Sequence, residues 1–433
     1  YILILLHVVP LSASVASNRP IFSGGDGIKS IYLWGAQLEV GSTATSYIPS
    51  NTQFTSRESV ASYVDSDGII QEAAIDEARY SHVLIDGKYV TTGLLLEPAG
   101  SNLIIRSEDF SDAYWFKTGA GTGSPPTVVA DAGTAPDGTF TADSIQFSLN
   151  GGTTSSDTSI VYSTSSTVVA GDITISIWLK SNTANSYDLL VATTASATKG
   201  VKCRVTPEWK RFDITHVASG TSSNLYFGLR NGAFGVSGVS DSAFILAWGA
   251  QLEQGSYPTS YIKAIAGVGD RDEDLSTSTA VTRNADVVTI KNPNDNINTL
   301  EGTYLLSQNE FKSGVEQVLL YMKNSSNMNY MKLYKTTTDT IKLLLSVEGD
   351  DYYIESAKVF NNNRIALMYD SNRLYLKTNS DQLMQTLFIP TLPTDMSSIK
   401  LGSDGTNYMN GYIGDFMCFA EKLTETEINR YTK

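Results

Sequence analysis

The chain has few of the residues on which many enzymes and metalloproteins depend. It contains two cysteines, Cys203 and Cys418, and three histidines among 433 residues. The two cysteines belong to different predicted domains, so they build neither a disulfide framework nor a cysteine-based metal motif. Packing must therefore hold the core, and cysteine usage indicates no particular redox compartment.

Charge is sparse and of predominantly one sign. Charged residues make up 18% of the chain, and the net charge is −14. Nucleic acids and anionic lipids are bound through clustered lysine and arginine, so this balance argues against both as partners. Acidity of this size is typical of an exposed protein that repels its neighbours in solution.

The apolar run that opens the chain is short. It extends for about 11 residues, from Tyr1 to Leu11, whereas a membrane-spanning helix needs about 20. No positively charged segment precedes it, as a signal sequence would require. We therefore expect a buried strand here, with a truncated signal sequence as the alternative, and no membrane insertion.

One segment of the chain occurs twice. Trp-Gly-Ala-Gln-Leu-Glu stands at residues 34–39 and again at 248–253, and Thr-Ser-Tyr-Ile follows at 45–48 and 259–262. The offset of about 214 residues is too long for a solenoid repeat and indicates a whole domain used twice. Only about 30 residues precede the first copy, so residues 1–50 are interpreted as the C-terminal part of a truncated jelly-roll domain.

Alternating apolar residues predict strands around the second copy. Phe244, Leu246, Trp248, Ala250 and Leu252 fall at every second position, which predicts one strand face on a core. Short strands separated by turn residues, in about 160 residues, favour a jelly roll over residues 101–263. The other predicted strands of this domain are 173–180, 202–205, 209–217 and 225–229.

Three further segments complete the predicted organisation. Residues 51–100 are predicted to be an extended connector with a hairpin at Asp67-Gly68, and residues 264–300 a second, polar connector. Thr424 and Glu427 form a capping-box pattern, which predicts a short terminal helix. Residues 301–433 are predicted to form a second sandwich from strands at 317–322, 331–334, 341–345, 364–369 and 373–377. The predicted fold class is all-β, with tandem antiparallel sandwiches joined by extended connectors.

Several segments together resemble modular structural proteins of tailed bacteriophages. Gly-Leu-Leu-Leu-Glu-Pro at 93–98, Asn102-Leu103, Ser107-Glu108-Asp109-Phe110 and Trp115 are similar to the opening of their carbohydrate-binding-module-like jelly rolls. Ala135-Pro136-Asp137-Gly138, the repeated tryptophan strand, Arg57 and residues 283–286 fit the same pattern. Residues 301–433 resemble a laminin-G or concanavalin-A-like sandwich through 411–416, Leu423-Thr424 and Glu427-Ile428.

The resemblance implies a virion fibre or spike on the exterior of the particle. Its partners would be further copies of itself in a homotrimer, other virion proteins and host-surface glycans, contacted multivalently. A polysaccharide-degrading tail enzyme and a purely architectural capsid or tail decoration protein are the alternatives.

A glycan-cleaving enzyme would need two carboxylates flanking a cleft. Glu97, Asp109, Asp213, Glu253 and Asp415 are candidates, but no two of them stand in a recognisable catalytic motif. His7, His82 and His216 accompany no nucleophile elbow, and we expect His216 to be a surface or hydrogen-bonded residue. The sequence therefore predicts no catalytic residues and no cofactor.

Metal and sugar sites have candidate residues only. Asp131, Asp137 and Asp143, and separately Asp65 and Asp67, could supply oxygen ligands to a structural calcium ion. Each of them is also a turn-forming aspartate beside glycine or in a loop. Sugar binding would use tyrosine rings beside polar groups, and the candidates in predicted loops are Tyr187, Tyr257, Tyr330, Tyr352, Tyr353 and Tyr408. Trp34, Trp178, Trp209 and Trp248 are predicted to be core residues.

Overall fold

The computed structural model describes residues 52–193, 199–264, 280–290, 298–309, 313–359, 363–379, 381–386, 389 and 396–432. The predictions for residues 1–50, which include Trp34 and His7, lie outside these ranges. The described residues from Phe54 onward belong to one compact unit. They form antiparallel sheets and one helix, α1 (Glu425–Tyr431), which confirms the predicted all-β fold class.

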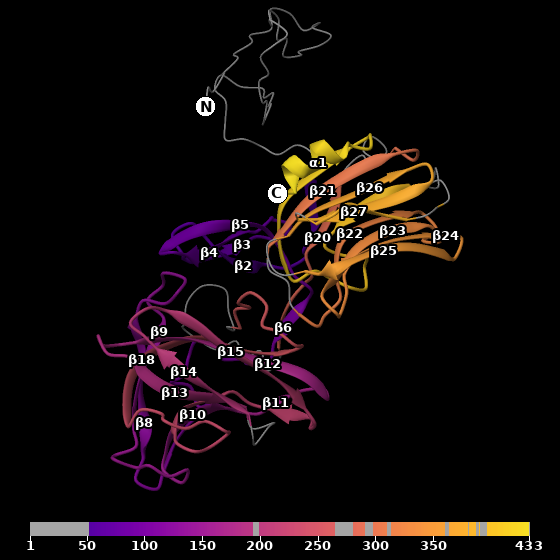
Figure 1. The fold of residues 1–433 in the computed structure, drawn as a ribbon. Helices are drawn as coiled ribbons and strands as arrows, with labels where there is room; N and C mark the ends of the chain where they lie inside the picture. The colour runs from indigo at the N-terminus through magenta and orange to yellow at the C-terminus, as the bar shows by residue number, and fades with distance from the viewer. Residues whose placement is uncertain are drawn as a thin grey trace, which may run out of the picture. The chain divides into compact units, whose positions relative to one another are not determined.

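Residues 115–254 supply a sandwich of two five-stranded sheets, drawn in purple and magenta in Figure 1. One sheet has the order β14 (Gly200–Val205), β13 (Tyr187–Ala192), β17 (Tyr226–Arg230), β10 (Thr158–Ser163) and β7 (Trp115–Ala120). The other has the order β15 (Lys210–Ala218), β12 (Gly171–Ser181), β18 (Ser242–Gln254), β9 (Ala142–Ser148) and β8 (Ser124–Gly133). A short ladder joins β11 (Ser166–Thr167) to β16 (Ser222–Ser223). We call this sandwich the jelly roll.

The predicted alternation along β18 is wrong for half of the strand. Gly249 has a φ of +65°, and the register with β12 shifts at this point, so Gly249 and Ala250 form a β-bulge. Beyond the bulge, Ala250 and Leu252 face the jelly-roll core. Before it, Leu246 and Trp248 face the opposite side of the sheet, where they belong to a separate apolar cluster. The extra residue moves the alternating apolar side chains to the other face of the sheet. A strict every-second-residue pattern in the sequence does not predict this change.

That separate cluster lies beneath a small hairpin. β2 (Ala61–Val64) and β3 (Ile70–Ala73) pair around the predicted Asp67-Gly68 turn, and Gly68 has the positive φ of +83° that such a turn requires. Ile70 of the hairpin packs with Leu246, Trp248 and other residues on the outer face of the jelly roll. Trp178 and Trp209 lie at the margin of this second core rather than in the jelly-roll core.

The C-terminal sandwich has two seven-stranded sheets, with its later strands in orange and yellow in Figure 1. One has the order β1 (Thr52–Ser56), β20 (Val287–Ile290), β29 (Met396–Leu401), β22 (Gln317–Asn324), β23 (Tyr330–Lys335), β24 (Thr340–Val347) and β25 (Asp350–Lys358). The other has the order β28 (Met384–Gln385), β27 (Arg373–Thr378), β26 (Asn363–Asp370), β21 (Gly302–Asn309), β30 (Gly411–Phe419), β5 (Lys88–Leu96) and β4 (Tyr80–Ile85). The side chains of Thr424 and Glu427 cap α1 reciprocally, as predicted.

The segments predicted to be connectors supply strands to this sandwich. β4 and β5 come from residues 51–100, and β5 pairs with β30. β20 comes from residues 264–300 and pairs with β29. The C-terminal sandwich therefore begins before the jelly roll in the sequence and resumes after it, so the jelly roll is an insertion within its chain path.

The chain enters and leaves the jelly roll through two paired strands. β6 (Gly100–Asn102) leads in, and β19 (Val281–Arg283) follows the jelly roll in sequence. They run antiparallel, with Gly100 opposite Arg283 and Asn102 opposite Val281. We call this two-stranded ladder the neck. Because both crossings lie together, side chains near the neck can hold the entering and leaving segments at once.

Candidate functional site

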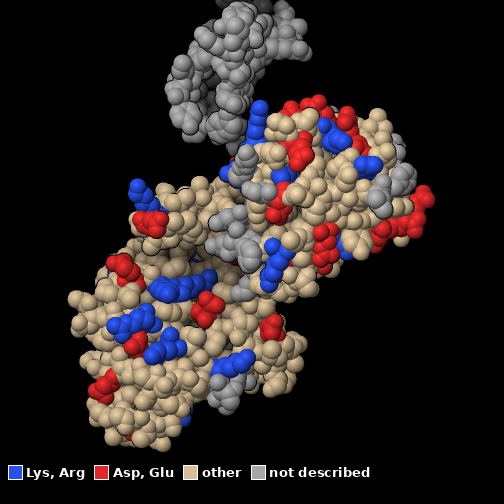
Figure 2. Space-filling view, viewed as in Figure 1, with Lys and Arg blue, Asp and Glu red and all other residues tan. Residues whose placement is uncertain are grey.

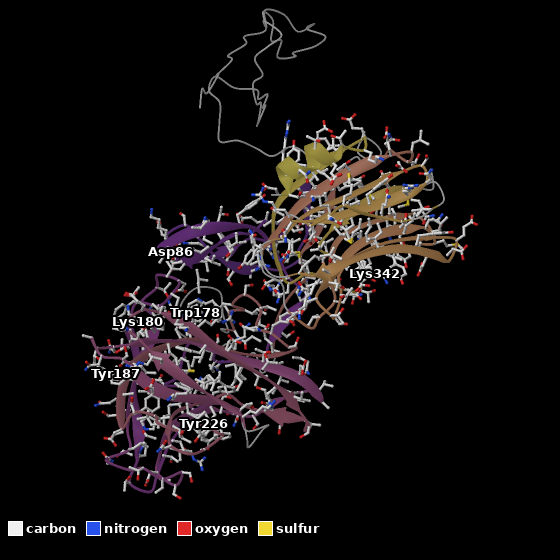
Figure 3. The ribbon with its side chains drawn as sticks, in the orientation of Figure 1. Asp86, Trp178, Lys180, Tyr187, Tyr226 and Lys342 are labelled. Atoms are coloured by element: carbon white, nitrogen blue, oxygen red, sulfur yellow. The ribbon has the colours of Figure 1, made fainter. Side chains whose placement is uncertain are left out.

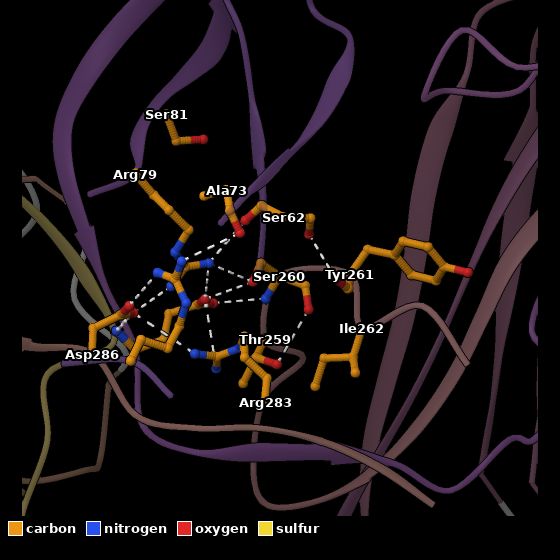
Figure 4. A network of polar contacts seen from close by, with 12 residues as sticks. Ser62, Ala73, Arg79, Ser81, Thr259, Ser260, Tyr261, Ile262, Arg283 and Asp286 are labelled. Carbon is orange, nitrogen blue, oxygen red and sulfur yellow. Dashed lines mark hydrogen bonds and ion pairs between the residues drawn. The ribbon is translucent and has the colours of Figure 1, made fainter. Parts of the chain in front are cut away.

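Five charged side chains lie buried together beside the neck (Figure 4). Arg57 and Arg79 are 0% exposed, Arg283 and Asp286 are 1% exposed, and Glu97 is 4% exposed. Charged side chains are almost never this buried unless they are paired. We call these five residues the neck cluster.

Each member comes from a chain segment next to a strand end. Arg57 follows β1, Arg79 precedes β4, and Glu97 follows β5. Arg283 ends β19, and Asp286 directly precedes β20. The cluster therefore gathers the segments that lead into the jelly roll and the segment that leads away from it.

Asp286 connects the three arginines. Its Oδ1 accepts a hydrogen bond from Arg57 Nη1 at 3.1 Å, its Oδ2 pairs with Arg79 Nη2, and Arg283 Nη1 lies 3.7 Å from Oδ2. Glu97 forms the second acidic centre, with Arg79 Nη1 at 2.8 Å and Arg283 Nη2 at 3.6 Å from its Oε2. The backbone N–H of Glu97 also donates to Asp286 Oδ2 at 2.9 Å. The two carboxylates and three guanidinium groups thus form one connected network.

The arginines also bind the main chain around them. An arginine that donates to several carbonyl groups fixes the loops that carry them, because its planar guanidinium presents five donors in fixed directions. The acceptors are the carbonyl oxygens of Ser59 and Ala74 for Arg57, of Ser62 for Arg79, and of Pro98 and Asn284 for Arg283.

The second copy of the repeated segment binds this cluster directly. Ser260 donates its backbone N–H to Glu97 Oε1 and its hydroxyl to Glu97 Oε2, both at 2.7 Å. Ser260 Oγ in turn accepts a hydrogen bond from Arg79 Nη1 at 2.7 Å. Thr259 donates its N–H and its hydroxyl to Glu253, at 2.9 and 2.6 Å. Two buried glutamates therefore hold two consecutive residues of the Thr-Ser-Tyr-Ile segment.

Tyr261, the next residue of the repeated segment, is held by contacts on the jelly-roll side. Its ring centroid lies 4.4 Å from that of Trp248, and its hydroxyl donates to Glu108 Oε1 at 2.7 Å. Its carbonyl accepts a hydrogen bond from Ser62 of the β2–β3 hairpin at 2.6 Å. Asn102 of β6 donates to the carbonyl oxygens of Ala250 and Ile262. The repeated residues thus tie the end of the jelly roll to both the hairpin and the neck.

Burial and charge act in opposite directions on the acids. Burial opposes ionisation of Glu97, but Arg283, Arg79 and the Ser260 hydrogen bonds lower its pKa to about 2. For Glu253, burial outweighs the hydrogen bonds from Thr259 and the charge of Arg211, so its pKa is raised. Glu97 is therefore a firmly ionised partner of the arginines. The Arg57 guanidinium has its pKa lowered by burial and by its arginine neighbours, with Asp286 opposing that change.

The structure places the candidate catalytic carboxylates in different surroundings. Glu97 and Glu253 are the two that come near each other, through Ser260 and Thr259, and both are buried. Asp109 caps the turn at Ser111 and Asp112. Asp213 and Asp415 are exposed, on β15 in the jelly roll and on β30 in the C-terminal sandwich. The described residues place no two of these five carboxylates on either side of an open cleft.

Two candidate histidines fall within the described residues. His82 on β4 lies with Nδ1 3.1 Å from the carbonyl oxygen of Val64. His216 is 4% exposed, and its Nε2 has no hydrogen-bond partner among the described residues. His216 therefore does not lie at the surface, because it shares the inward face of β15 with Phe212 and Ala218. Burial lowers its pKa.

The candidate calcium ligands serve as turn and loop acceptors. Asp65 Oδ1 accepts the N–H groups of Asp67 and Ile69, and Asp137 Oδ1 accepts the N–H and hydroxyl of Thr139. Asp143 is buried and accepts the N–H groups of Phe110 and Asp131. Within the described ranges, no three His, Cys, Asp or Glu side chains gather as a metal-binding group.

The six candidate tyrosines divide between core and surface. Tyr187 and Tyr352 pack against the cores of their sandwiches, and Tyr257 is half-buried. Tyr408 is half-buried in a loop, with its hydroxyl 3.4 Å from the carbonyl oxygen of Gly405. Tyr330 and Tyr353 lie on the same outer face of the C-terminal sandwich.

An aromatic row that the sequence analysis did not identify crosses the jelly roll. Phe116, Tyr162 and Tyr226 are cross-strand partners on the outer face of one sheet, with ring centroids 5.0 and 6.2 Å apart and nearly parallel planes. Figure 3 labels Tyr226 in this row. Because the rings stack on one another, most of their faces are covered, which leaves edges rather than faces for a ligand.

Other site residues were also missed from the sequence. Arg79 and Arg211 carry no motif, yet both reach the repeated segment, Arg211 through a 2.6 Å hydrogen bond to the Thr259 carbonyl oxygen. A signal was present, because Arg57, Glu97 and Asp286 stand in the segments used for the family resemblance. Pairing among them across 189 to 229 residues cannot be inferred from local pattern.

Comparisons with known proteins give limited matches. No family model matches the chain, and no curated protein matches it. Among solved structures, the CBM40 domain of the Ruminococcus gnavus IT-sialidase is 21% identical, covers 31% of this chain and 84% of its own, and has a TM-score of 0.28. A leech intramolecular trans-sialidase gives the same identity and TM-score over 23% of its chain and 31% of this one. A heptameric SAP-like pentraxin of Limulus polyphemus is 14% identical over 31% of this chain and 70% of its own, with a TM-score of 0.24.

At these scores the likeness does not transfer a ligand or an activity to this chain. The described residues also contain no helix that is long and apolar enough to cross a membrane. The neck cluster and the surfaces of the two sandwiches are therefore the features from which a function can be argued.

Proposed function

We propose that this chain is a non-enzymatic structural and attachment component of a bacteriophage virion, in a fibre or spike on the particle exterior. Its partners in this role are further copies of itself, as a homotrimer, other virion proteins and a host-surface glycan. The proposal joins the family resemblance of the sequence to the way in which this chain uses its charged residues.

The neck cluster is the observation that carries the proposal. Five charged side chains with at most 4% exposure bind one another, main-chain carbonyls and the repeated segment. A catalytic carboxylate must reach its substrate, whereas Glu97 and Glu253 are enclosed. These groups fasten one β-module to the next, which is the task of a modular appendage.

Weak surface contacts suit such an appendage. Several linked copies raise the effective concentration of each site, so avidity exceeds the affinity of one copy by orders of magnitude. Charges of both signs are scattered over the face seen in Figure 2, with wide uncharged areas between them. A multivalent surface of this kind needs no deep pocket.

Labelling of intact particles tests the proposal. Gold-conjugated antibody against the jelly roll should decorate an external appendage in electron micrographs, and mass spectrometry of purified particles should contain the chain. Absence of the chain from particles contradicts the proposal. Steady release of reducing ends from host polysaccharide by the purified chain contradicts its non-enzymatic part.

A further inference from the structure

Exposed apolar side chains are concentrated in one hairpin of the described residues. Leu84, Ile85, Tyr89 and Val90 are between 38% and 60% exposed, and all four stand within residues 84–90. After this hairpin, the large exposed apolar residues stand singly in the sequence, which is ordinary for a protein surface. We call residues 82–91, the outer part of the β4–β5 hairpin, the finger.

The finger extends beyond the sheet that carries it. β4 is the end strand of that sheet, and β5 pairs with β30 only through residues 94–96. Among the described residues, the strands of the finger therefore pair only with each other, from His82 opposite Thr91 to Ile85 opposite Lys88. Figure 3 labels Asp86 at its turn. A two-stranded ribbon by itself is only marginally stable in water, so the finger would be stabilised by a further contact.

One face of the finger packs against the β2–β3 hairpin. His82 Nδ1 contacts the carbonyl oxygen of Val64, and a Cβ added to Gly68 would overlap the Tyr89 ring. Leu84 stands opposite Tyr89 on this face and remains 60% exposed. This side of the finger is thus partly occupied by the same chain.

The other face has no such cover among the described residues. Val83 stands opposite Val90, and Ile85 opposite Lys88. Directly opposite residues share one face of a ribbon, so three β-branched apolar residues and one lysine lie together here. Ile85 is 51% exposed and Val90 is 44% exposed. We call this surface the free face; by register it carries no acid, and Asp86 lies beside it in the turn.

The outer strand of the finger also lacks the usual protection of a sheet edge. Charged residues and proline on edge strands oppose pairing with other chains. Five of the eight edge strands of the sandwich sheets contain one or the other, namely β7, β8, β14, β15 and β25. β28 has only two residues, while β4 and β1 contain neither charge nor proline. An apolar, unprotected edge such as β4 is suited to contact with another chain.

Charge indicates which chain fits. Because the net charge is −14, two copies repel each other over most of their surfaces. The finger instead carries one acid and one base, Asp86 and Lys88, and neither forms an ion pair within the described ranges. Copies related by a rotation axis present the same finger to one another, so Asp86 of one copy can pair with Lys88 of the next.

A lipid surface is the other partner that apolar side chains suit. Insertion of the finger tip into hydrocarbon would also carry Asp86 and Lys88 out of water, which is costly for charged groups. An acidic chain is in addition repelled by anionic lipid headgroups. The two charges therefore favour a protein partner that offers a base and an acid in return.

We propose that copies of this chain associate through the finger, with the free face and the β4 edge of one copy packed against the finger of the next. Such a contact buries Ile85 and Val90 and pairs Asp86 with Lys88. Contacts between like subunits are more apolar than the remaining surface, as the finger is. This inference rests on the homotrimer of the proposed function and names the residues of its contact.

Sedimentation velocity of the full chain over a range of concentrations tests the proposal. The double variant Ile85→Glu/Val90→Glu should raise the dissociation constant for self-association roughly 100-fold, because each change removes an apolar anchor and adds a repelling charge. Val169→Glu/Val217→Glu makes the same change of charge at two exposed valines of the jelly roll and is the matched control. It should associate as the unmodified chain does. Matching circular dichroism spectra show that the variants are folded.

The charge of the finger is tested separately. Lys88→Glu should weaken self-association roughly tenfold, since a glutamate at this position faces Asp86 of the next copy. Sodium chloride at about 1 M should reverse most of that loss, because salt screens repulsion between exposed charges. A loss that salt does not reverse contradicts the pairing of Asp86 with Lys88.

The outcomes separate this inference from the proposed function. Undiminished association of the Ile85→Glu/Val90→Glu variant, or an equal loss in the Val169→Glu/Val217→Glu control, refutes the finger and leaves the homotrimer. A monomeric unmodified chain overturns both the finger contact and the homotrimer, and flotation of that monomer with phosphatidylcholine vesicles would assign the finger to lipid. Particle labelling decides the virion role independently of all these results.

Discussion

Ser260 donates both its backbone N–H and its hydroxyl to the carboxylate of Glu97, which stands 163 residues earlier in the chain. The two residues belong to the end of the jelly roll and to the segment that enters it. This contact couples the insertion to the sandwich from which it departs. Its strength depends on Glu97 being ionised and on Arg79 and Arg283 being beside it.

We expect Glu97→Gln to lower the free energy of unfolding by about 3–5 kcal/mol, because it leaves Arg79 and Arg283 buried without their acidic partner. Urea denaturation measures this loss. Glu72→Gln makes the same change at an exposed site on β3 and should stay within about 0.5 kcal/mol. A loss below about 1 kcal/mol for Glu97→Gln would show that the arginines find other acceptors.

The same ion pairs predict an acid limit of stability. The pKa of Glu97 is lowered from 4.5 to about 2, so its contribution is fully present above about pH 4.5. That contribution is lost as the pH falls toward 2, and the Glu97→Gln variant should lack this part of the loss.

Asp143 should make stability depend on pH in the direction opposite to that expected from Glu97. Burial, with a smaller contribution from Asp109, raises its pKa from 3.8 to about 7, against the opposing hydrogen bond from Phe110. The folded chain therefore binds a proton that the unfolded chain releases between about pH 4 and 7, and stability falls as the pH rises through this range.

Asp143→Asn should remove that slope, as thermal unfolding recorded at a series of pH values would show. Asp137→Asn, in a turn where the amide oxygen can replace the carboxylate acceptor, should leave the slope unchanged. An unaltered slope in the Asp143→Asn variant refutes the assignment to this residue.

The bulge in β18 should make the fold sensitive to substitution of Gly249. Its φ of +65° disfavours any side chain, and an added Cβ would lie 3.0 Å from Trp178 Cδ1. Gly249→Ala should therefore destabilise the fold by about 1–2 kcal/mol in urea denaturation. Gly220→Ala is the control, because its Cβ would meet open space without a left-handed φ. Equal stability of the two variants would mean that the bulge relaxes freely.

Local features of the fold followed from the sequence. The Asp67-Gly68 hairpin and the Thr424–Glu427 capping box depend on residues a few positions apart, whose geometry is set by backbone sterics and short-range hydrogen bonds. The sheet face on which Trp248 lies did not follow from the sequence, because the bulge at Gly249 interrupts the alternation of faces along the strand. Trp248 is fully buried, as expected of a core residue, but in a second core outside the jelly roll.

The long-range arrangement could not be read from local pattern. β5 and β20 were interpreted as connector segments, because nothing in their sequences identifies β30 and β29 as their partners. Arg79 was overlooked for the same reason, since its ion-pair partners, Glu97 and Asp286, stand 18 and 207 positions further along the chain and no local motif links them to it. Domain insertion in particular leaves no mark on composition or periodicity.

Because β6 pairs with β19, the chain enters and leaves the jelly roll at one place on the C-terminal sandwich. Since its two chain crossings are adjacent, the host sandwich completes its sheets whatever the size of the insert. Replacement of the jelly roll by another domain at the neck would change the surface that the molecule presents, while the C-terminal sandwich that carries it stays the same.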